Sequence, residues 1–137
     1  MTQASPRNQT AVARGIAPRA IERAATAPRT GAADAARCQL AMQLAAHRFD
    51  ASRTMMLARG RGSRRASVAR QVAIYLAHVA LGVPLGTTAR QFRRHRSSAA
   101  FACRQVEDRR DEPAFDVALA DLELAIRVLL DLASEVR

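Results

Sequence analysis

The segment from residue 68 to residue 81 is apolar on nearly every side, and this feature restricts the fold more than any other. Its apolar residues include Val72, Ile74, Tyr75, Leu76, Val79 and Ala80. On a helix these positions almost encircle the axis, which is typical of a helix at the centre of a domain. Ser67 is expected to cap the start of this helix, and Gly82 stands in the position after the last turn that glycine favours. The sequence therefore predicts a central helix that other helices cover.

The composition agrees with an all-helical domain. The chain has 137 residues, of which only five are aromatic, so its core must consist mostly of Ala, Leu, Val and Ile. There are no runs of alternating β-branched residues, which would indicate strands. A chain of this length holds one small domain of roughly 100 residues and a tail. We therefore expect an all-α domain over residues 32–137, preceded by a disordered tail rich in Arg, Ala and Pro over residues 1–31.

The spacing of apolar residues predicts five further helices. The first is a helix over 32–47 with Ala36, Leu40, Leu44 and His47 on one face, followed by a turn and a short helix over 49–58, which Asp50 caps and in which Met55, Met56 and Leu57 face inward. A third helix covers 85–92 after Pro84, and a fourth covers about 97–110 with Ser97 as its cap. The last covers about 112–134, with Pro113 in its first turn. Residues 59–65 are expected to form a flexible basic loop.

The last predicted helix carries two apolar stripes. One consists of Phe115, Leu119, Leu122, Ile126, Leu129 and Ala133, and the other of Val117, Leu124, Val128 and Leu132. A helix that covers one side of a small domain needs only one such stripe. Either the helix simply covers the core, or the second stripe is an interface with a second copy of the chain or with another protein.

The distribution of charge is more informative than its total. The net charge is +10, and all 22 basic residues are arginine, which codon bias in a GC-rich genome can explain. Residues 1–104 contain 18 arginines and three acids, whereas residues 105–137 contain four arginines and nine acids. This pattern favours a polyanion-binding surface followed by an acidic segment.

Enzymatic, metal-binding and membrane functions find little support in the sequence. His47, His78 and His95 are far apart and lack carboxylates at the spacing of a triad or metal site, and the two cysteines, Cys38 and Cys103, have no metal-ligand spacing. No apolar run approaches the roughly 18 residues of a membrane span. The first thirty residues lack the apolar stretch of a secretory signal, although their composition would also suit a mitochondrial transit peptide. We expect a cytoplasmic protein with reduced thiols, no cofactor and no catalytic activity.

The two short helices over 85–92 and 97–110 have the dimensions of a helix-turn-helix. In such a unit the second helix lies in the major groove of DNA, with its N-terminal residues at the base edges. Here the turn and the helix start read Arg93, Arg94, His95, Arg96, Ser97 and Ser98. Cations at the positive end of a helix repel one another in water, and phosphates relieve that repulsion. The cluster therefore favours DNA binding over the alternative, a solvated arginine cluster.

Residues 70–107, RQVAIYLAHVALGVPLGTTARQFRRHRSSAAFACRQVE, resemble the C-terminal DNA-binding domain of the bacterial replication initiator DnaA. The matching residues are Arg70, Gln71, Ala73, Leu76, Leu85, Phe92, Ser97, Ser98, Ala102, Cys103, Arg104 and Glu107, and weaker similarity extends from about Cys38 to about Leu130. The resemblance implies phosphate contacts from Arg70, Gln71 and His78. It also implies a minor-groove arm at Arg61, Arg64 and Arg65, and major-groove readout by His95, Arg96, Ser97 and Ser98.

The sequence departs from that family at three places. Arg93 replaces a pair of glycines with one residue fewer, His95-Arg96 replaces Asp-His, and Phe101 replaces a histidine of the recognition helix. The preferred DNA sequence should therefore differ from the one that the initiator binds. The chain also lacks the lysine-containing phosphate-binding loop of the initiator's ATPase module.

These observations lead to one functional hypothesis and two alternatives. The hypothesis is a stand-alone regulator of transcription, most simply an activator, that binds double-stranded DNA sequence-specifically at the bacterial nucleoid. Lone domains of this kind are similar to alphaproteobacterial activators of gene transfer agent clusters. Its last helix would then bind RNA polymerase, another regulator or a second copy. The alternatives are a non-specific nucleic-acid or nucleoid protein, and an adaptor that acts only through the last helix.

Overall fold

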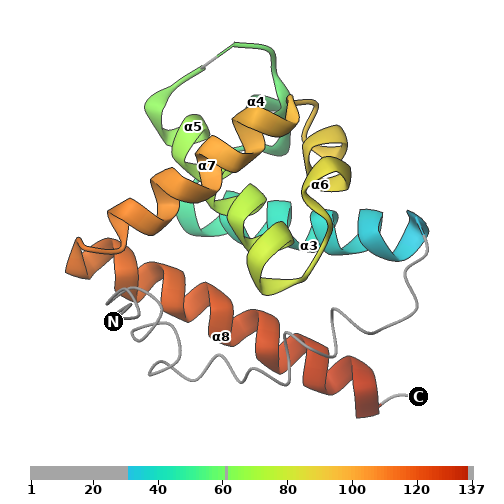
Figure 1. Cartoon of the computed structure of the whole chain (residues 1–137). Coiled ribbons are helices and arrows are strands. Elements are labelled where there is room, and N and C mark those ends of the chain that lie inside the picture. The colour runs from blue at the N-terminus through green and yellow to red at the C-terminus, as the bar shows by residue number, and fades with distance from the viewer. Residues whose placement is uncertain (1–30, 61, 136–137) are drawn as a thin grey trace, which may run out of the picture.

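Helices make up every regular element that the computed structural model shows over residues 31–60 and 62–135, the residues that it describes. In chain order they are α3 (Gly31–Phe49), α4 (Arg53–Leu57), α5 (Arg64–Tyr75), η1 (Leu76–Ala80), α6 (Leu85–Gln91), α7 (Arg96–Arg109) and α8 (Pro113–Glu135) (Figure 1). The expectation of an all-α fold is confirmed. The predicted tail lies outside the described residues except for Gly31, which already belongs to α3, and Arg61 lies outside them as well.

The central helix predicted from its encircling apolar residues is α5 together with η1, a π-helical turn that continues it. Every residue from Val72 to Ala77 is buried, and α3, α6 and α7 all pack against this rod. Phe92, at the end of α6, is fully buried in the same core. Truncating a buried phenylalanine to alanine costs about 3–5 kcal/mol, so this residue fixes the position of the α6–α7 pair.

Three helices begin at residues other than those predicted. Ser52, not Asp50, caps α4 by accepting a hydrogen bond from the Met55 amide at 3.1 Å. Ser63, not Ser67, caps α5 by accepting one from the Ala66 amide at 3.1 Å. The cap of α7 is His95 rather than Ser97, and its side chain makes no capping hydrogen bond.

These corrections have local causes. Asp50 has a φ of 52°, which ends α3 and leaves the capping position to Ser52. Gly60 and Gly62 also have positive φ values, so the chain reverses early and α5 begins at Arg64. The predicted basic loop is therefore shorter, and Arg64 and Arg65 lie in the first turn of a helix.

The buried face of α3 differs from the predicted one. Its buried apolar residues are Cys38, Ala41, Met42 and Ala45, whereas Ala36 and His47 are exposed and Leu40 and Leu44 are half-buried. The small side chains Ala41 and Ala45 let α3 lie close to α5, and this close packing decides which face turns inward. Similarly, Met56 of α4 is buried as expected, but Met55 is 43% exposed.

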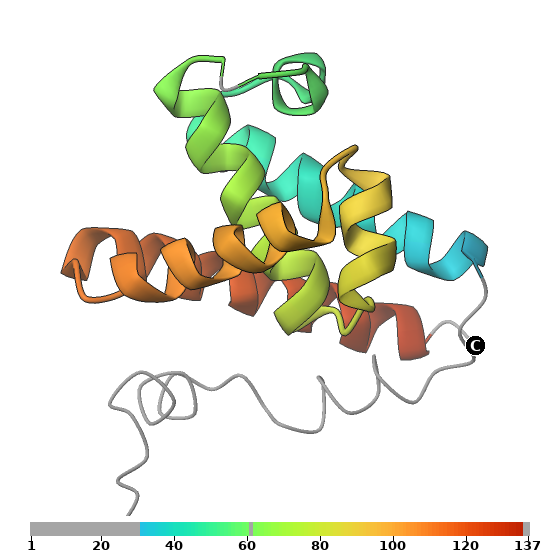
Figure 2. The same ribbon diagram turned by 45° about the horizontal axis from the view of Figure 1, so that its top comes forward.

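The last helix, α8, buries one of its two apolar stripes. Phe115, Leu119, Leu122 and Ile126 are buried, while Leu129 and Ala133 of the same predicted stripe are exposed. The second stripe is exposed throughout: Val117 is 60% exposed, Leu124 54%, Val128 49% and Leu132 53%. In both views α8 lies on the side of the domain opposite to α4 (Figures 1 and 2). None of the helices within the described residues is long and apolar enough to cross a membrane.

Candidate nucleic-acid interface

The chain from α4 through the first three turns of α7 has no acidic residue. Between Asp50 and Glu107 there are eleven arginines and no aspartate or glutamate. Asp50 itself lies within 3.3 Å of Arg65, but both side chains are exposed, and such pairs contribute little to stability. The arginines of this stretch therefore carry a positive charge that their own surroundings barely compensate.

Three helices in this stretch begin with an arginine. These are α4 at Arg53, α5 at Arg64 and α7 at Arg96, and none of them has an acidic residue in its first turn. The two helices outside the stretch, α3 and α8, each have an aspartate there. A helix N-terminus is already partly positive, so an arginine at this place is unfavourable until an anion approaches.

The turn between α6 and α7 has a defined backbone geometry. The Arg94 amide donates to the carbonyl oxygen of Ala89 at 2.9 Å, and the Arg93 amide donates to that of Arg90 at 3.1 Å. Arg93 has a φ of 56°. This is the Schellman arrangement, in which the residue after the helix adopts a left-handed conformation. It directs the chain out of α6 and into the exposed start of α7.

Arg94 connects this turn to the loop before α5. Its guanidinium donates to the carbonyl oxygens of Ala58, at 2.8 Å, and Gly60, at 3.2 Å. Accordingly, α4 and the loop that follows it lie beside the α6–α7 turn in both views (Figures 1 and 2). Sequence reasoning treated Arg94 only as a DNA contact, but the structure gives it an additional, internal role.

A surface groove of about 340 Å³ lies between α5 and α7, below this loop. It is lined by Gly60, Ser67, Arg70, Gln71, Ile74, Arg94, Ser98, Phe101 and Ala102. The structure thus brings together four of the residues predicted to bind DNA, namely Arg70, Gln71, Arg94 and Ser98. Three different elements contribute them.

Arg70 is the most buried cation of the groove, with only 8% of its surface exposed. Its guanidinium has two long hydrogen bonds of 3.4 Å, to the carbonyl oxygen of Met56 and to the Ser67 hydroxyl. Burial, and then the charge of nearby Arg94, lower the pKa of Arg70. Within residues 31–60 and 62–135 neither arginine forms an ion pair with a carboxylate. An anion in the groove would therefore relieve the repulsion between two cations.

The remaining predicted residues, apart from His78 and Arg61, surround the groove on exposed surfaces. His95, Arg96 and Ser97 form the tip of α7, Arg93 lies in the turn before it, and Arg64 and Arg65 begin α5. Farther along α7, Phe101 is 51% exposed and Arg104 is exposed, whereas Ala99, Ala102 and Val106 are buried. The outward face of α7 therefore carries Phe101 and Arg104 as well as the predicted residues at its tip.

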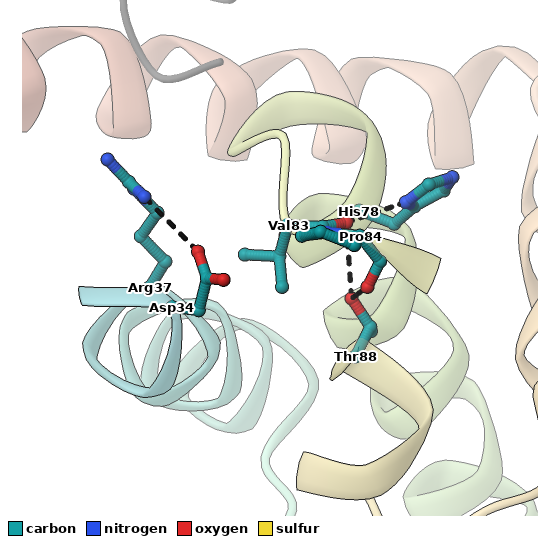
Figure 3. Close-up of polar contacts among 6 residues, drawn as sticks. All are labelled: Asp34, Arg37, His78, Val83, Pro84 and Thr88. Carbon is teal, nitrogen blue, oxygen red and sulfur yellow. Dashed lines mark hydrogen bonds and ion pairs between the residues drawn. The ribbon is translucent and has the colours of Figure 1, made fainter. Parts of the chain in front are cut away.

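His78 is separated from the other predicted residues. Its Nδ1 lies 2.7 Å from the carbonyl oxygen of Val83, next to Thr88, whose hydroxyl donates to the carbonyl oxygen of Pro84 at 3.1 Å (Figure 3). His78 belongs to η1, seven residues after Gln71 of the groove, which is about 10 Å along a helical rod. The structure therefore places it at the entry of α6 and not in the groove.

A buried ionic cluster surrounds Arg110 and was not predicted from the sequence. This guanidinium lies 2.7 Å from Asp116 and 2.7 Å from Glu123, and it donates to the Tyr75 hydroxyl at 3.3 Å. Burial disfavours the charged form of Arg110, but the hydrogen bond and charge of Glu123 outweigh burial and raise its pKa. The cluster joins the end of α7 to α8 and to α5. No spacing rule predicts it, because its members come from different elements.

The other titratable side chains do not suggest a second kind of site. Cys38 and Cys103 are free thiols, and burial raises the pKa of each to about 11, so both are neutral near pH 7. Across the part of the chain that the structure describes, no three His, Cys, Asp or Glu side chains are grouped so that they could hold a metal ion.

Comparison with known proteins adds no relative: no protein-family model and no curated protein matches the chain.

Proposed function

We propose that this protein binds double-stranded DNA sequence-specifically through the helix-turn-helix formed by α6 and α7, and that it regulates transcription in this way. One observation carries the proposal. The outward face of α7, with its exposed hydroxyls and arginines, borders a groove that contains two arginines without a carboxylate partner among the described residues. A surface of this kind suits base edges beside backbone phosphates.

Each part of the surface has a proposed role. The tip of α7, with His95, Arg96, Ser97 and Ser98, enters the major groove, where an arginine can bind guanine through two hydrogen bonds. Arg70, Gln71 and Arg94 hold a backbone phosphate in the surface groove. Arg64 and Arg65, with Arg61 outside the described residues, reach the adjacent minor groove. His78 is expected to contact a phosphate only at the separate place where α6 begins.

The resemblance of residues 70–107 to the DNA-binding domain of DnaA supports the same conclusion. On that basis the protein is a stand-alone regulator, most simply an activator, that acts at the nucleoid without the initiator's ATPase module. Activators of gene transfer agent clusters are the nearest functional analogy. This assignment describes a binding protein and assigns it no reaction or cofactor.

The test begins with a binding selection from random duplex, followed by fluorescence anisotropy at several salt concentrations. We expect at least ~10³-fold preference for the selected site over random duplex. Arg64→Gln combined with Arg96→Gln should weaken binding to the selected site, with a loss of about 1–3 kcal/mol at the base pair that Arg96 reads. It should also flatten the plot of log affinity against log salt, because two positive charges leave the interface. Both side chains are exposed and form no ion pair within the described residues, so the fold should persist. Arg127→Gln, on the distant α8, is the matched control.

Two results would contradict the proposal. Equal affinity for every duplex would support the alternative of a non-specific nucleoid protein. Absence of any salt-dependent affinity for duplex would support an adaptor that acts only through α8.

The exposed stripe of α8 favours a second, compatible role in protein binding. Val117, Leu124, Val128 and Leu132 are about half exposed or more along one helix, an unusual arrangement for large apolar side chains. We propose that this stripe binds a second copy of the chain or a component of the transcription machinery such as RNA polymerase. Sedimentation of the purified wild type and of the interface variant Leu124→Glu distinguishes these two partners. If both proteins sediment as monomers, the homodimer is excluded.

A further inference from the structure

A second arginine-lined hollow lies between α4 and the α6–α7 turn. Its volume is about 370 Å³, and it is lined by Arg53, Thr54, Leu57, Ala58 and Arg93. Ala58 and Gly60, whose carbonyl oxygens Arg94 holds, line this hollow and the first groove respectively. The loop over residues 58–60 therefore borders two arginine-lined depressions. The sequence analysis did not single out Arg53.

The backbone conformation of Arg93 indicates that its side chain has a functional role. At a φ of 56°, in the position after a helix end, glycine is favoured because it has no Cβ to clash with the backbone. An arginine at this place is strained and gains no compensating ion pair among the described residues. What arginine provides, and glycine does not, is an exposed guanidinium at the edge of the hollow.

Arg53 supplies the second cation from a different element. It is the first residue of α4, whose position is fixed by the cap at Ser52 and by Met56, which is buried in the core. No ion pair with a described carboxylate neutralises Arg53 either. Arg53, Thr54 and Arg93 thus line the same space. Two arginines and a threonine hydroxyl are donors that suit a phosphate group.

We propose that the hollow formed by Arg53, Thr54 and Arg93 binds a backbone phosphate of the DNA, next to the phosphate bound by Arg70 and Arg94. The inference rests on the proposed function. Ala58 lines one phosphate site and Gly60 lines the other, so the two bound phosphates together would hold the 58–60 loop against the duplex. Contacts from α4 would extend the interface beyond the helix-turn-helix.

The test compares DNA binding of the full chain with that of Arg53→Gln, Arg93→Gln and Arg93→Gly at several salt concentrations. Each variant should reduce the slope of log affinity against log salt by about one phosphate equivalent and weaken binding to selected and random duplex alike. The control is again Arg127→Gln, which removes the same charge from the far side of the domain and should leave the slope unchanged.

Arg93→Gly also separates binding from folding. Because glycine relieves the strained φ, this variant should unfold about 3–6 °C higher than the wild type while it binds DNA more weakly. Arg93→Gln keeps the strain and should show the weaker binding without the higher Tm. Opposite changes in stability and affinity cannot result from damage to the fold.

The possible failures are distinguishable. If the wild type binds no duplex, the proposed function itself is wrong. If the wild type binds and the slopes of Arg53→Gln and Arg93→Gln equal that of the wild type, only the second phosphate site is wrong. The second phosphate site is also wrong if the loss of affinity in either variant is confined to one base pair, since removing a phosphate contact weakens binding to all sequences.

Discussion

Arg110 and Arg94 belong to the same small domain, yet carboxylates compensate the positive charge of Arg110 and not that of Arg94. Arg110 is buried, lies 2.7 Å from each of two carboxylates and reaches a tyrosine hydroxyl. Arg94 is half-buried, donates to two backbone carbonyl oxygens and lies near another cation, Arg70. Carbonyl oxygens satisfy the hydrogen bonds of a guanidinium but leave its positive charge uncompensated.

The difference separates structural arginines from arginines that remain available for a ligand. Around Arg110 the acidic segment of the chain neutralises the positive charge and holds α8 in place. Around Arg94 the chain provides no acidic residue between Asp50 and Glu107. The positive electrostatic potential of the basic surface is therefore available to attract an anionic ligand. Four predictions test this comparison.

The largest effect is expected from Arg110→Met. It leaves Asp116 and Glu123 buried without their cation, and breaking a buried ion pair in this way costs about 3–5 kcal/mol. Urea unfolding followed by circular dichroism measures the loss. The triple variant Arg110→Met, Asp116→Ala and Glu123→Met should recover at least half of it, because it also removes the stranded charges. A loss below about 1 kcal/mol for Arg110→Met would contradict the structural role of this cluster.

Tyr75→Phe is expected to cost about 1–2 kcal/mol near pH 7, because Arg110 loses a buried acceptor. Burial, and then the charge of Glu123, raise the pKa of Tyr75 above its ordinary value. Its hydroxyl therefore ionises more readily in the unfolded chain, and the stability it contributes is lost as pH rises above about 10. Urea unfolding at several pH values should show the difference between the two proteins narrowing there. A constant difference would argue against the raised pKa.

Arg94→Gln is expected to lower stability by only about 1 kcal/mol, because its hydrogen bonds are partly exposed. The effect should be local: hydrogen exchange of the amides around residues 58–60 should speed up, while α8 remains protected. Arg90→Gln provides the control, since Arg90 is exposed and its guanidinium donates to Thr87 of its own helix. Equal exchange in the two variants would show that Arg94 does not hold the loop.

Salt should have the smallest effect, and its sign is informative. Raising NaCl from about 50 mM to about 500 mM screens the repulsion among the exposed arginines but hardly affects the buried Arg110 pairs. We therefore expect stabilisation by about half a kcal/mol, measured by thermal unfolding. In Arg64→Gln combined with Arg96→Gln the gain should shrink. Destabilisation by salt in the wild type would mean that favourable ion pairs dominate both regions.

The sequence predicted the helices well where burial alone decides them. The all-α fold, the central position of residues 68–81 and the buried stripe from Phe115 to Ile126 follow from apolar spacing, and the structure agrees. Helix starts were harder to predict, because the turn before each helix decides which of several neighbouring residues becomes the cap. Asp50, Ser67 and Ser97 were the wrong choices for this reason.

The candidate site could be predicted only in part. Its basic residues are evident from the sequence, but the groove between α5 and α7 depends on how the helices cross. The internal bonds of Arg94 and the separate place of His78 could not be foreseen, since both involve backbone carbonyl groups that every residue carries. Arg53 was overlooked because α4 is short and its approach to the α6–α7 turn is a tertiary contact.

The hydrogen bonds from Arg94 to the 58–60 loop have a consequence for how such a protein can diversify. Because they end on main-chain oxygens, replacing the side chain of Ala58 or Arg59 would leave the attachment intact, whereas Gly60 has to keep its positive φ. Substitutions at these two positions would keep the hydrogen bonds that attach the loop to Arg94. The surface that this loop presents can thus change while the domain that carries it stays the same.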